Sequence, residues 1–156
     1  MEVTTQEYRD ALSKFASGIT IVTVTAGEQP HGMTASAFAA VSLEPPLVLV
    51  CLEKTSRTRA LVLEVGTFAV SVLVEGQQEI AKAFSRPGKK PFDDLSHRPG
   101  KNGAPLLDGA IACIECSVEQ VVEGGDHDIV VGEMAACEVR GGQPLVYFNR
   151  GYRSLS

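Results

Sequence analysis

The sequence has no cluster of basic residues and no long apolar run. Its 156 residues include 14 Lys and Arg against 19 Asp and Glu, which gives a formal net charge of −5. Nucleic-acid binding is therefore not expected, because neutralising a phosphate backbone takes clustered basic side chains. No apolar run approaches the ~18 residues of a membrane span, and the charged first residues lack the apolar stretch of a signal peptide. We expect no membrane association and a cytoplasmic location.

Motifs for several other kinds of chemistry are missing as well. No G-x-G-x-x-G follows a strand-like segment, and there is no phosphate-binding P-loop. His31, His97, His127 and the cysteines lack the spacing of metal ligands, so no metal site is expected. No catalytic triad and no paired acid and base stand out. These absences argue against nucleotide hydrolysis, metal catalysis and acyl transfer.

The two cysteines nearest in sequence, Cys113 and Cys116, lie in a segment that alternates as a strand does. Apolar residues at positions 112, 114, 116 and 118 alternate with positions 113, 115, 117 and 119. Residues three apart on a strand point to opposite faces, and a cytoplasmic location keeps thiols reduced. We expect two packed thiols, with a redox or metal site as the alternative.

The chain does contain enough apolar residues, 44%, to predict one folded domain over residues 1–156. Its periodicity predicts a helix, a strand, two strands broken at Pro45 and Pro46, a helix, a strand, a helix, a hairpin and a short closing strand. In that order the ranges are 4–16, 18–27, 33–53, 56–66, 67–75, 77–85, 110–140 and 144–155. Residues 86–109 show no period and are interpreted as a long surface loop. The expected fold is mainly β, an antiparallel sheet or barrel with short flanking helices.

A possible anion site lies where the apolar strand at 47–52 runs into the helix that begins near Ser56. Free amides at a helix N-terminus favour an anion, and the hydroxyls and the guanidinium of Ser56, Arg57 and Thr58 add hydrogen bonds. A capped helix with solvated charges is the alternative. Upstream, the small residues at 34–37 would let a planar ligand lie against the strand backbone, or would simply allow tight strand packing.

The stretch EGGDHDIVVG, residues 123–132, places His127 between two aspartates after a pair of glycines. A turn led by glycine presents the imidazole outward. Asp126 and Asp128 could fix its tautomer or raise its basicity. A solvated turn histidine is the alternative.

Three segments together carry a family resemblance: GMTASAFAAVSLEPPLVLVCLEKTSRT, GDHDIVVGEM and PLVYFNRGYR. From about Tyr8 to Leu155 the chain resembles the short-chain flavin reductases, the NAD(P)H-dependent reductase components of two-component flavin monooxygenases. The resemblance implies an FMN-binding split β-barrel, FMN or FAD as the flavin, and NADH or NADPH as the hydride donor. It also implies an oxygenase that receives the reduced flavin, and a homodimer with the flavin near the subunit interface.

The resemblance also implies site residues. The flavin would lie against Thr34, Ala35, Ser36 and Ala37. Its ribityl and phosphate groups would be held by Cys51, Leu52, Lys54, Ser56, Arg57 and Thr58. Phe84, Ser85 and Arg86 would lie near the flavin, and His127, with Gly125 and Asp126, would lie where nicotinamide stacks.

Hydride transfer is chemistry that the two cofactors supply, so the protein has to bind and orient them rather than provide an acid and a base. The sparse set of catalytic residues agrees with that task. Two rival functions remain: a flavoprotein of the same fold that keeps its flavin and acts on another substrate, and a flavin-binding module without enzymatic activity.

Overall fold

The computed structural model describes residues 2–156 and is mainly β. Its strands are β1 (Ser17–Gly18), β2 (Thr20–Ala26), β3 (Gln29–Ala35), β4 (Phe38–Ser42), β5 (Leu47–Glu53), β6 (Thr67–Val72), β7 (His97–Pro99), β8 (Pro105–Leu107), β9 (Ala112–Gly124), β10 (His127–Val139), β11 (Val146–Phe148) and β12 (Gly151–Arg153). Its α-helices are α1 (Thr5–Leu12), α2 (Arg57–Val65) and α3 (Gln78–Ser85), and Phe92–Asp94 form a single 3-10 turn.

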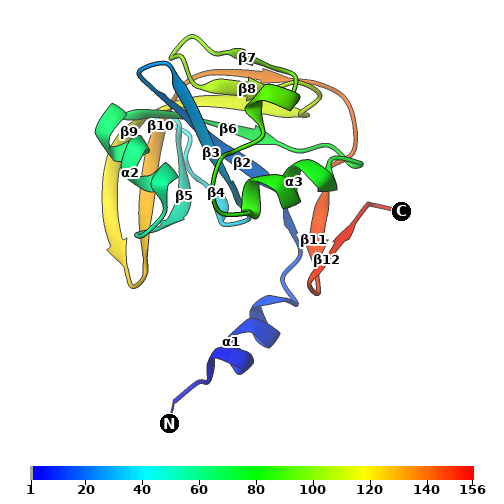
Figure 1. Cartoon of the computed structure of the whole chain (residues 1–156). Coiled ribbons are helices and arrows are strands. Elements are labelled where there is room, and N and C mark those ends of the chain that lie inside the picture. Colours follow the sequence, from blue (N-terminus) through cyan, green and yellow to red (C-terminus); the bar gives the residue numbers. More distant parts are fainter. Residues whose placement is uncertain (1) are drawn as a thin grey trace.

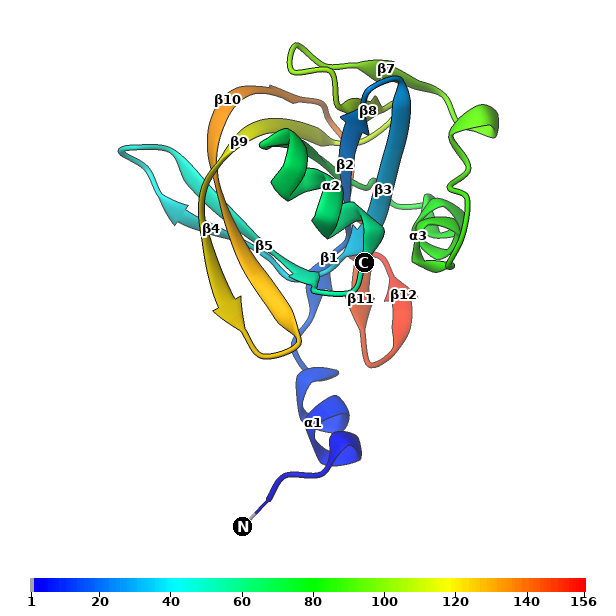
Figure 2. The same cartoon turned by 60° about the vertical axis from the view of Figure 1, so that its left-hand side comes forward.

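Seven antiparallel strands form the main sheet in the order β3-β2-β6-β9-β10-β5-β4. The sheet curls around the core, and its two edge strands, β3 and β4, follow one another in the chain (Figures 1 and 2). The predicted antiparallel β fold is therefore confirmed, with the barrel split between β3 and β4.

The core follows from strand alternation. On β5 the side chains of Val48, Val50 and Leu52 are buried, while the residues between them are half-buried on the outer face. Strand β2 is buried on both faces: Val22 packs inside the curled sheet, and Ile21 packs with Phe84 of α3. Full burial of each such side chain contributes about 1.5–3 kcal/mol. This packing fixes α3 against β2 and β3.

The predicted helices at 56–66 and 77–85 are confirmed as α2 and α3. Ser56 caps α2, because its Oγ accepts a hydrogen bond from the Arg59 amide at 3.2 Å. The helix ends at Gly66, which adopts the left-handed conformation at φ 84° that a glycine tolerates best. The hydrophobic side of α2 packs on the sheet through Leu61 and Val62.

Helix α1 is shorter than the sequence predicted and buries nothing. Thr4 and Glu7 form a reciprocal capping box at its start, and the helix ends at Leu12 rather than at 16. None of its residues is buried, although Tyr8 and Leu12 share its apolar side. Figures 1 and 2 show α1 projecting away from the barrel.

Two sequence predictions are wrong in part. The segment predicted as one strand before Pro45 contains the end of β3 and all of β4, separated by Ser36 and Ala37. Residues 86–109 are not simply a surface loop, because they hold the β7–β8 pair and bury Phe92, Leu106 and Leu107. Strands of three residues are too short to show a period among the many prolines and glycines.

A half-buried asparagine holds the 97–107 hairpin against the sheet. Asn102 donates from Nδ2 to the carbonyl of Phe68 at 3.1 Å and accepts from the amide of Ala104 at 3.0 Å. The backbone amide of Asn102 donates to the carboxylate of Glu115, which is buried. These polar contacts explain how a segment with few apolar residues packs closely.

The cysteine pair packs as the alternation predicts. Cys113 lies with Leu106 under the hairpin, whereas Cys116 lies with Phe68 inside the sheet. All four cysteines are free, and burial raises the pKa of Cys116 to about 12. Within residues 2–156 there is no group of His, Cys, Asp and Glu side chains that could hold a metal ion, and no helix there has the length and apolarity to cross a membrane.

Candidate functional site

A hollow of about 630 Å³ lies between β3, the start of α2, and the end of α3 with the loop after it. Seven of the predicted site residues line it: Thr34, Ser56, Arg57, Thr58, Phe84, Ser85 and Arg86. We call it the cationic pocket, because Arg57, Arg86 and Lys90 line it against a single acid, Glu53. None of these three cations forms an ion pair within residues 2–156.

The corner of the pocket at α2 is built for an anion. Ser56 donates from Oγ to the Glu53 carbonyl at 2.8 Å and accepts from the amide of Arg59. The earlier amides of a first helical turn have no partner inside the helix, and here they belong to Arg57 and Thr58. Together with the positive end of the helix dipole they favour a phosphate.

His31 on β3 also lines this pocket, and sequence reasoning considered it only as a metal ligand. Its Nδ1 and the Oγ1 of Thr58 are hydrogen-bonded at 3.0 Å. Burial lowers the pKa of His31, and the positive charges of Lys90 and Arg57 lower it further. His31 is therefore neutral near pH 7 and lies close to both cations. The available signal was its place three residues before Thr34, where the small residues at 34–37 begin.

The small-residue stretch is divided between two hollows. Thr34 faces the cationic pocket and donates from Oγ1 to the carbonyl of Ala81 in α3 at 2.6 Å. Ala35 is buried, and its carbonyl accepts from Thr20. Ser36 and Ala37 instead line a second hollow of about 610 Å³. We call this the apolar groove, because most of its lining is apolar, including Tyr8, Leu12, Phe15, Phe38, Leu49 and Val72.

Strand β3 meets α3 closely at Gly32. A side chain at this position would lie 2.9 Å from the carbonyl oxygen of Val22 and 3.2 Å from the ring of Phe84. Only glycine fits there without a shift of backbone atoms, so Gly32 lets Phe84 form the pocket wall against the strand.

The remaining strand-end residues of the predicted phosphate segment have other surroundings. The side chain of Leu52 is fully buried in the core and turned away from both hollows. Cys51 is half-buried, its amide donates to the Ala37 carbonyl at 3.1 Å, and burial raises the pKa of its thiol. Lys54 forms an ion pair with Glu123 instead of facing the pocket.

Three contacts tie the tip of the β9–β10 hairpin to the start of α2. The amide of Lys54 donates to the carbonyl of Asp126 at 3.0 Å, and its side chain pairs with Glu123. Arg59 donates from both Nε and Nη2 to Asp128, each at 2.7 Å. Asp128 is buried. Sequence reasoning missed this charged pair, which fixes α2 to β10, because its two residues are 69 apart in the chain.

His127 is the first residue of β10 and lies beside the pocket rather than in its lining. Its Cα partner on β5 is Glu53, which does line the pocket. Its Nδ1 is 2.7 Å from Asp126, and this hydrogen bond lowers the pKa of the Asp126 carboxyl. The expected contact with Asp128 is absent, because neighbours on a strand point to opposite faces and Asp128 turns inward to Arg59.

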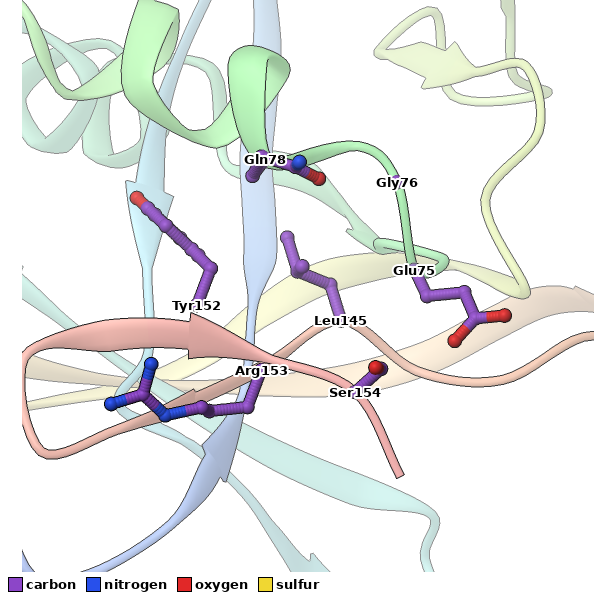
Figure 3. Close-up of a pocket in the computed structure, with 7 residues that line it drawn as sticks. All are labelled: Glu75, Gly76, Gln78, Leu145, Tyr152, Arg153 and Ser154. Carbon is purple, nitrogen blue, oxygen red and sulfur yellow. The ribbon is translucent and has the colours of Figure 1, made fainter. Parts of the chain in front are cut away.

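The described residues include a third hollow, of about 470 Å³, near the start of α3 (Figure 3). It is lined by Glu75, Gly76, Gln78, Leu145, Tyr152, Arg153 and Ser154. None of the residues predicted for the site lies there. The chemistry indicated by the sequence therefore falls between α2, α3 and the β10 start.

A pocket with a helix N-terminus and with three cations that form no ion pair within residues 2–156 suits a phosphate ester. Residues 12–156 match the family described as "Flavin reductase like domain". This chain belongs to the flavin reductase family. The predicted family is thereby confirmed, together with the oxidoreductase class and the use of a flavin and a nicotinamide nucleotide.

Relatives in the flavin reductase family are similar over most of this chain. A "Probable flavin reductase" of Rhizobium meliloti (strain 1021) is 41% identical over 92% of this chain, which spans only 47% of that longer protein. The reductase component of 4-hydroxyphenylacetate 3-monooxygenase from Thermus thermophilus is 38% identical, with 96% of each chain covered.

Solved flavin reductase structures are similar in fold. BorF, the flavin reductase component of a bacterial two-component tryptophan halogenase, has a TM-score of 0.91 and 40% identity, with 97% of this chain and 98% of BorF covered. The NADH:FAD oxidoreductase SgcE6 of Streptomyces globisporus, in complex with NAD and FAD fragments, has a TM-score of 0.94 and 34% identity, with 100% and 98% covered. The predicted split-barrel fold is confirmed.

Proposed function

We propose that this protein is an NADH-dependent flavin reductase that releases reduced flavin to a separate oxygenase. The observation that carries the proposal is the cationic pocket. Its anion corner, Arg57 and the first amides of α2, follows strand β5, and Glu53 at the end of β5 pairs with His127 of β10. The family match over residues 12–156 supports one flavin reductase-like domain across the chain. Relatives named reductase components or subunits of monooxygenases support the oxygenase partner.

The residues of the pocket fit the phosphate end of a flavin. Arg57 forms no ion pair within residues 2–156, and the hydroxyls of Ser56 and Thr58 fix the same corner through their hydrogen bonds to Glu53 and His31. In this proposal Thr34 lies along the ribityl chain, and Ser36 and Ala37 border the ring. Phe84, Ser85 and Arg86 close the opposite wall. The side chains of Ala35 and Leu52 are buried, so they support the site through the backbone.

The protein's part in the reaction is orientation. A bound flavin supplies a hydride acceptor, and reduced nicotinamide supplies the hydride. His127, held at Nδ1 by Asp126, leaves Nε2 to hydrogen-bond the carboxamide of the nicotinamide. Holding the two rings stacked lowers the entropic part of the activation free energy for hydride transfer. This is the main contribution that a site without an acid or base can make.

We also propose that the protein acts as a homodimer in which each α1 covers its partner. An isolated helix of eight residues is marginal in water, yet Tyr8, Leu12 and Phe15 are 61%, 53% and 75% exposed. We call residues 4–15, which include α1, the arm. It is held in place, because the amide of Asn149 donates to the carbonyl of Ser13 and Lys14 donates to Asn149. The arm is fixed but its apolar side is exposed, so burial of these side chains requires contact with another protein surface.

A second copy supplies that surface by symmetry. In a two-fold pair the same arm reaches the same groove on each copy, and the apolar groove already runs from α1 to Phe38 and Leu49. Ser36 and Ala37 line this groove, so the partner's arm would border the flavin ring. We place the dimer in the cytoplasm, which suits four free cysteines.

Steady-state NADH oxidation with FMN, FAD and riboflavin, each in a micromolar series, tests the proposed function. We expect slow oxidation by the protein alone and a saturable increase with added flavin. A rate that stays constant across the series, with flavin retained through purification, would instead indicate a flavoprotein that acts on another substrate. Flavin binding without any NADH oxidation would indicate a binding module.

A further inference from the structure

The wall of the cationic pocket opposite α2 carries positive charge that the described residues do not neutralise. Other cations nearby are paired: Arg59 with Asp128, Lys82 with Glu79, and Lys89 with Asp93. Arg86 and Lys90 have no carboxylate partner within residues 2–156, in a chain whose net charge is −5. Free cations gathered in a concave site of an acidic protein attract an anion.

Lys90 is placed by contacts that leave its charge free. Its Nζ donates to the carbonyl of Phe84 at 3.2 Å and to that of Arg86 at 2.5 Å. Both carbonyls lie at the C-terminus of α3, and the loop that follows lines the pocket at residues 86–88 and 90. An ammonium has three donors, so one remains for a ligand. Partial burial without a carboxylate lowers the pKa of Lys90.

His31 lines the cationic pocket from β3, beside the anion corner of α2. His31, Arg57 and Lys90 line the same pocket although they come from β3, α2 and the loop after α3, and the charges of both cations lower the pKa of the His31 ring. With Nδ1 bonded to Thr58, the ring keeps Nε2 for the pocket. A neutral imidazole with hydrogen on Nε2 would add a donor to the site without adding charge.

We propose that Lys90 and His31 complete a phosphate clamp, in which Lys90 binds a flavin phosphate from the loop after α3 and His31 binds it beside Arg57 and the α2 amides. The clamp makes the protein selective for phosphorylated flavins over riboflavin. This inference rests on the proposed function, since it concerns the same pocket. The chemistry recognised is a phosphate ester, which FMN carries once and FAD carries as a diphosphate.

The test compares Lys90→Gln with Lys89→Gln in flavin-binding titrations. Both changes remove one charge from the same loop, but Lys89 pairs with Asp93 and does not line the pocket. Glutamine at position 90 can still donate to the α3 carbonyls, and thermal unfolding reports whether the fold is kept. We expect Lys90→Gln to weaken FMN or FAD binding about tenfold or more, riboflavin to change little, and Lys90→Arg to restore binding.

The flavins whose binding weakens in Lys90→Gln show which phosphate Lys90 contacts. Equal losses for FMN and FAD place Lys90 at the phosphate next to the ribityl chain, whereas a loss confined to FAD places it at the second phosphate. His31→Gln is expected to weaken the same ligands about twofold to tenfold. Equal losses for riboflavin, no loss for any flavin, or a change only in the KM for NADH would overturn the inference. If the wild-type protein binds no flavin, the proposed function itself fails.

Discussion

The cationic pocket and the apolar groove lie on either side of the small-residue stretch, and they are built in different ways. The corner of the pocket at α2 comes from one continuous segment, residues 53–58, where a strand ends and a capped helix begins, whereas Arg86 and Lys90 come from the loop after α3. The groove combines α1, β2, β4, β5 and β6, which are far apart in the chain. The α2 corner of the proposed phosphate site is thus encoded locally, whereas the rest of the pocket and the apolar groove depend on tertiary folding. In the proposed dimer the groove would also depend on a second copy.

Asp128→Ala is expected to have the largest effect, because it removes the tie that fixes the pocket to the His127 hairpin. Asp128 is buried, and its partner Arg59 is 30% exposed, so water can solvate the arginine that is left. We expect unfolding to become easier by about 2 kcal/mol, measured by urea denaturation. Asp126→Ala on the exposed side of the same turn is the matched control, and an equal loss there would contradict this account.

Arg57→Ala tests the charge of the pocket without touching the groove. One charge-assisted hydrogen bond is lost, so FMN and FAD should bind about tenfold to a hundredfold more weakly. Riboflavin should be affected far less, because it lacks the phosphate. Titration of the three flavins measures this, and equal losses for FMN and riboflavin would show that Arg57 supports the ring or the fold instead.

Phe15→Ser breaks the groove without touching the pocket. Phe15 is 75% exposed on the arm, so the substitution should leave monomer stability nearly unchanged. We expect the dimer dissociation constant to rise about tenfold or more, since covering a Phe side chain contributes about 1.5–3 kcal/mol. Sedimentation at several concentrations measures the association. A wild-type protein that is monomeric at high concentration would exclude the proposed dimer.

His127→Ala should have the smallest effect. If His127 orients nicotinamide, the loss of a neutral hydrogen bond should raise the KM for NADH or slow hydride transfer, by about tenfold or less. Flavin affinity should hardly change, because the phosphate contacts lie at α2 and α3. Stopped-flow reduction beside a flavin titration separates the two, and wild-type kinetics would make His127 a solvated turn residue.

The sequence predicted the parts of the site that depend on neighbours in the chain. The Ser56 cap, the α2 start and the β9–β10 turn at His127 all follow from local patterns. It could not predict the Arg59–Asp128 pair or the contact of His31 with Thr58, because these join segments 69 and 27 residues apart. The expected contact of Asp128 with His127 was wrong, because neighbours on a strand point to opposite faces, and only the fold shows that Arg59 lies on the side of Asp128.

The 86–109 segment was the main error of the sequence-based fold. Its apolar residues Phe92, Leu106 and Leu107 are too scattered to show a period, yet the fold buries them. The hydrogen bonds of Asn102 hold the hairpin in place, and no periodicity reports them. Lys90, which lines the pocket, falls in the same segment.

The central claim is that NADH reduces a flavin whose phosphate is held in the cationic pocket. It is tested most directly by comparing kcat/KM for FMN, FAD and riboflavin in NADH oxidation by the wild-type protein. The account predicts a rate that rises with added flavin and a value for FMN or FAD at least about tenfold above that for riboflavin. A rate independent of added flavin, or equal values for all three flavins, would contradict it.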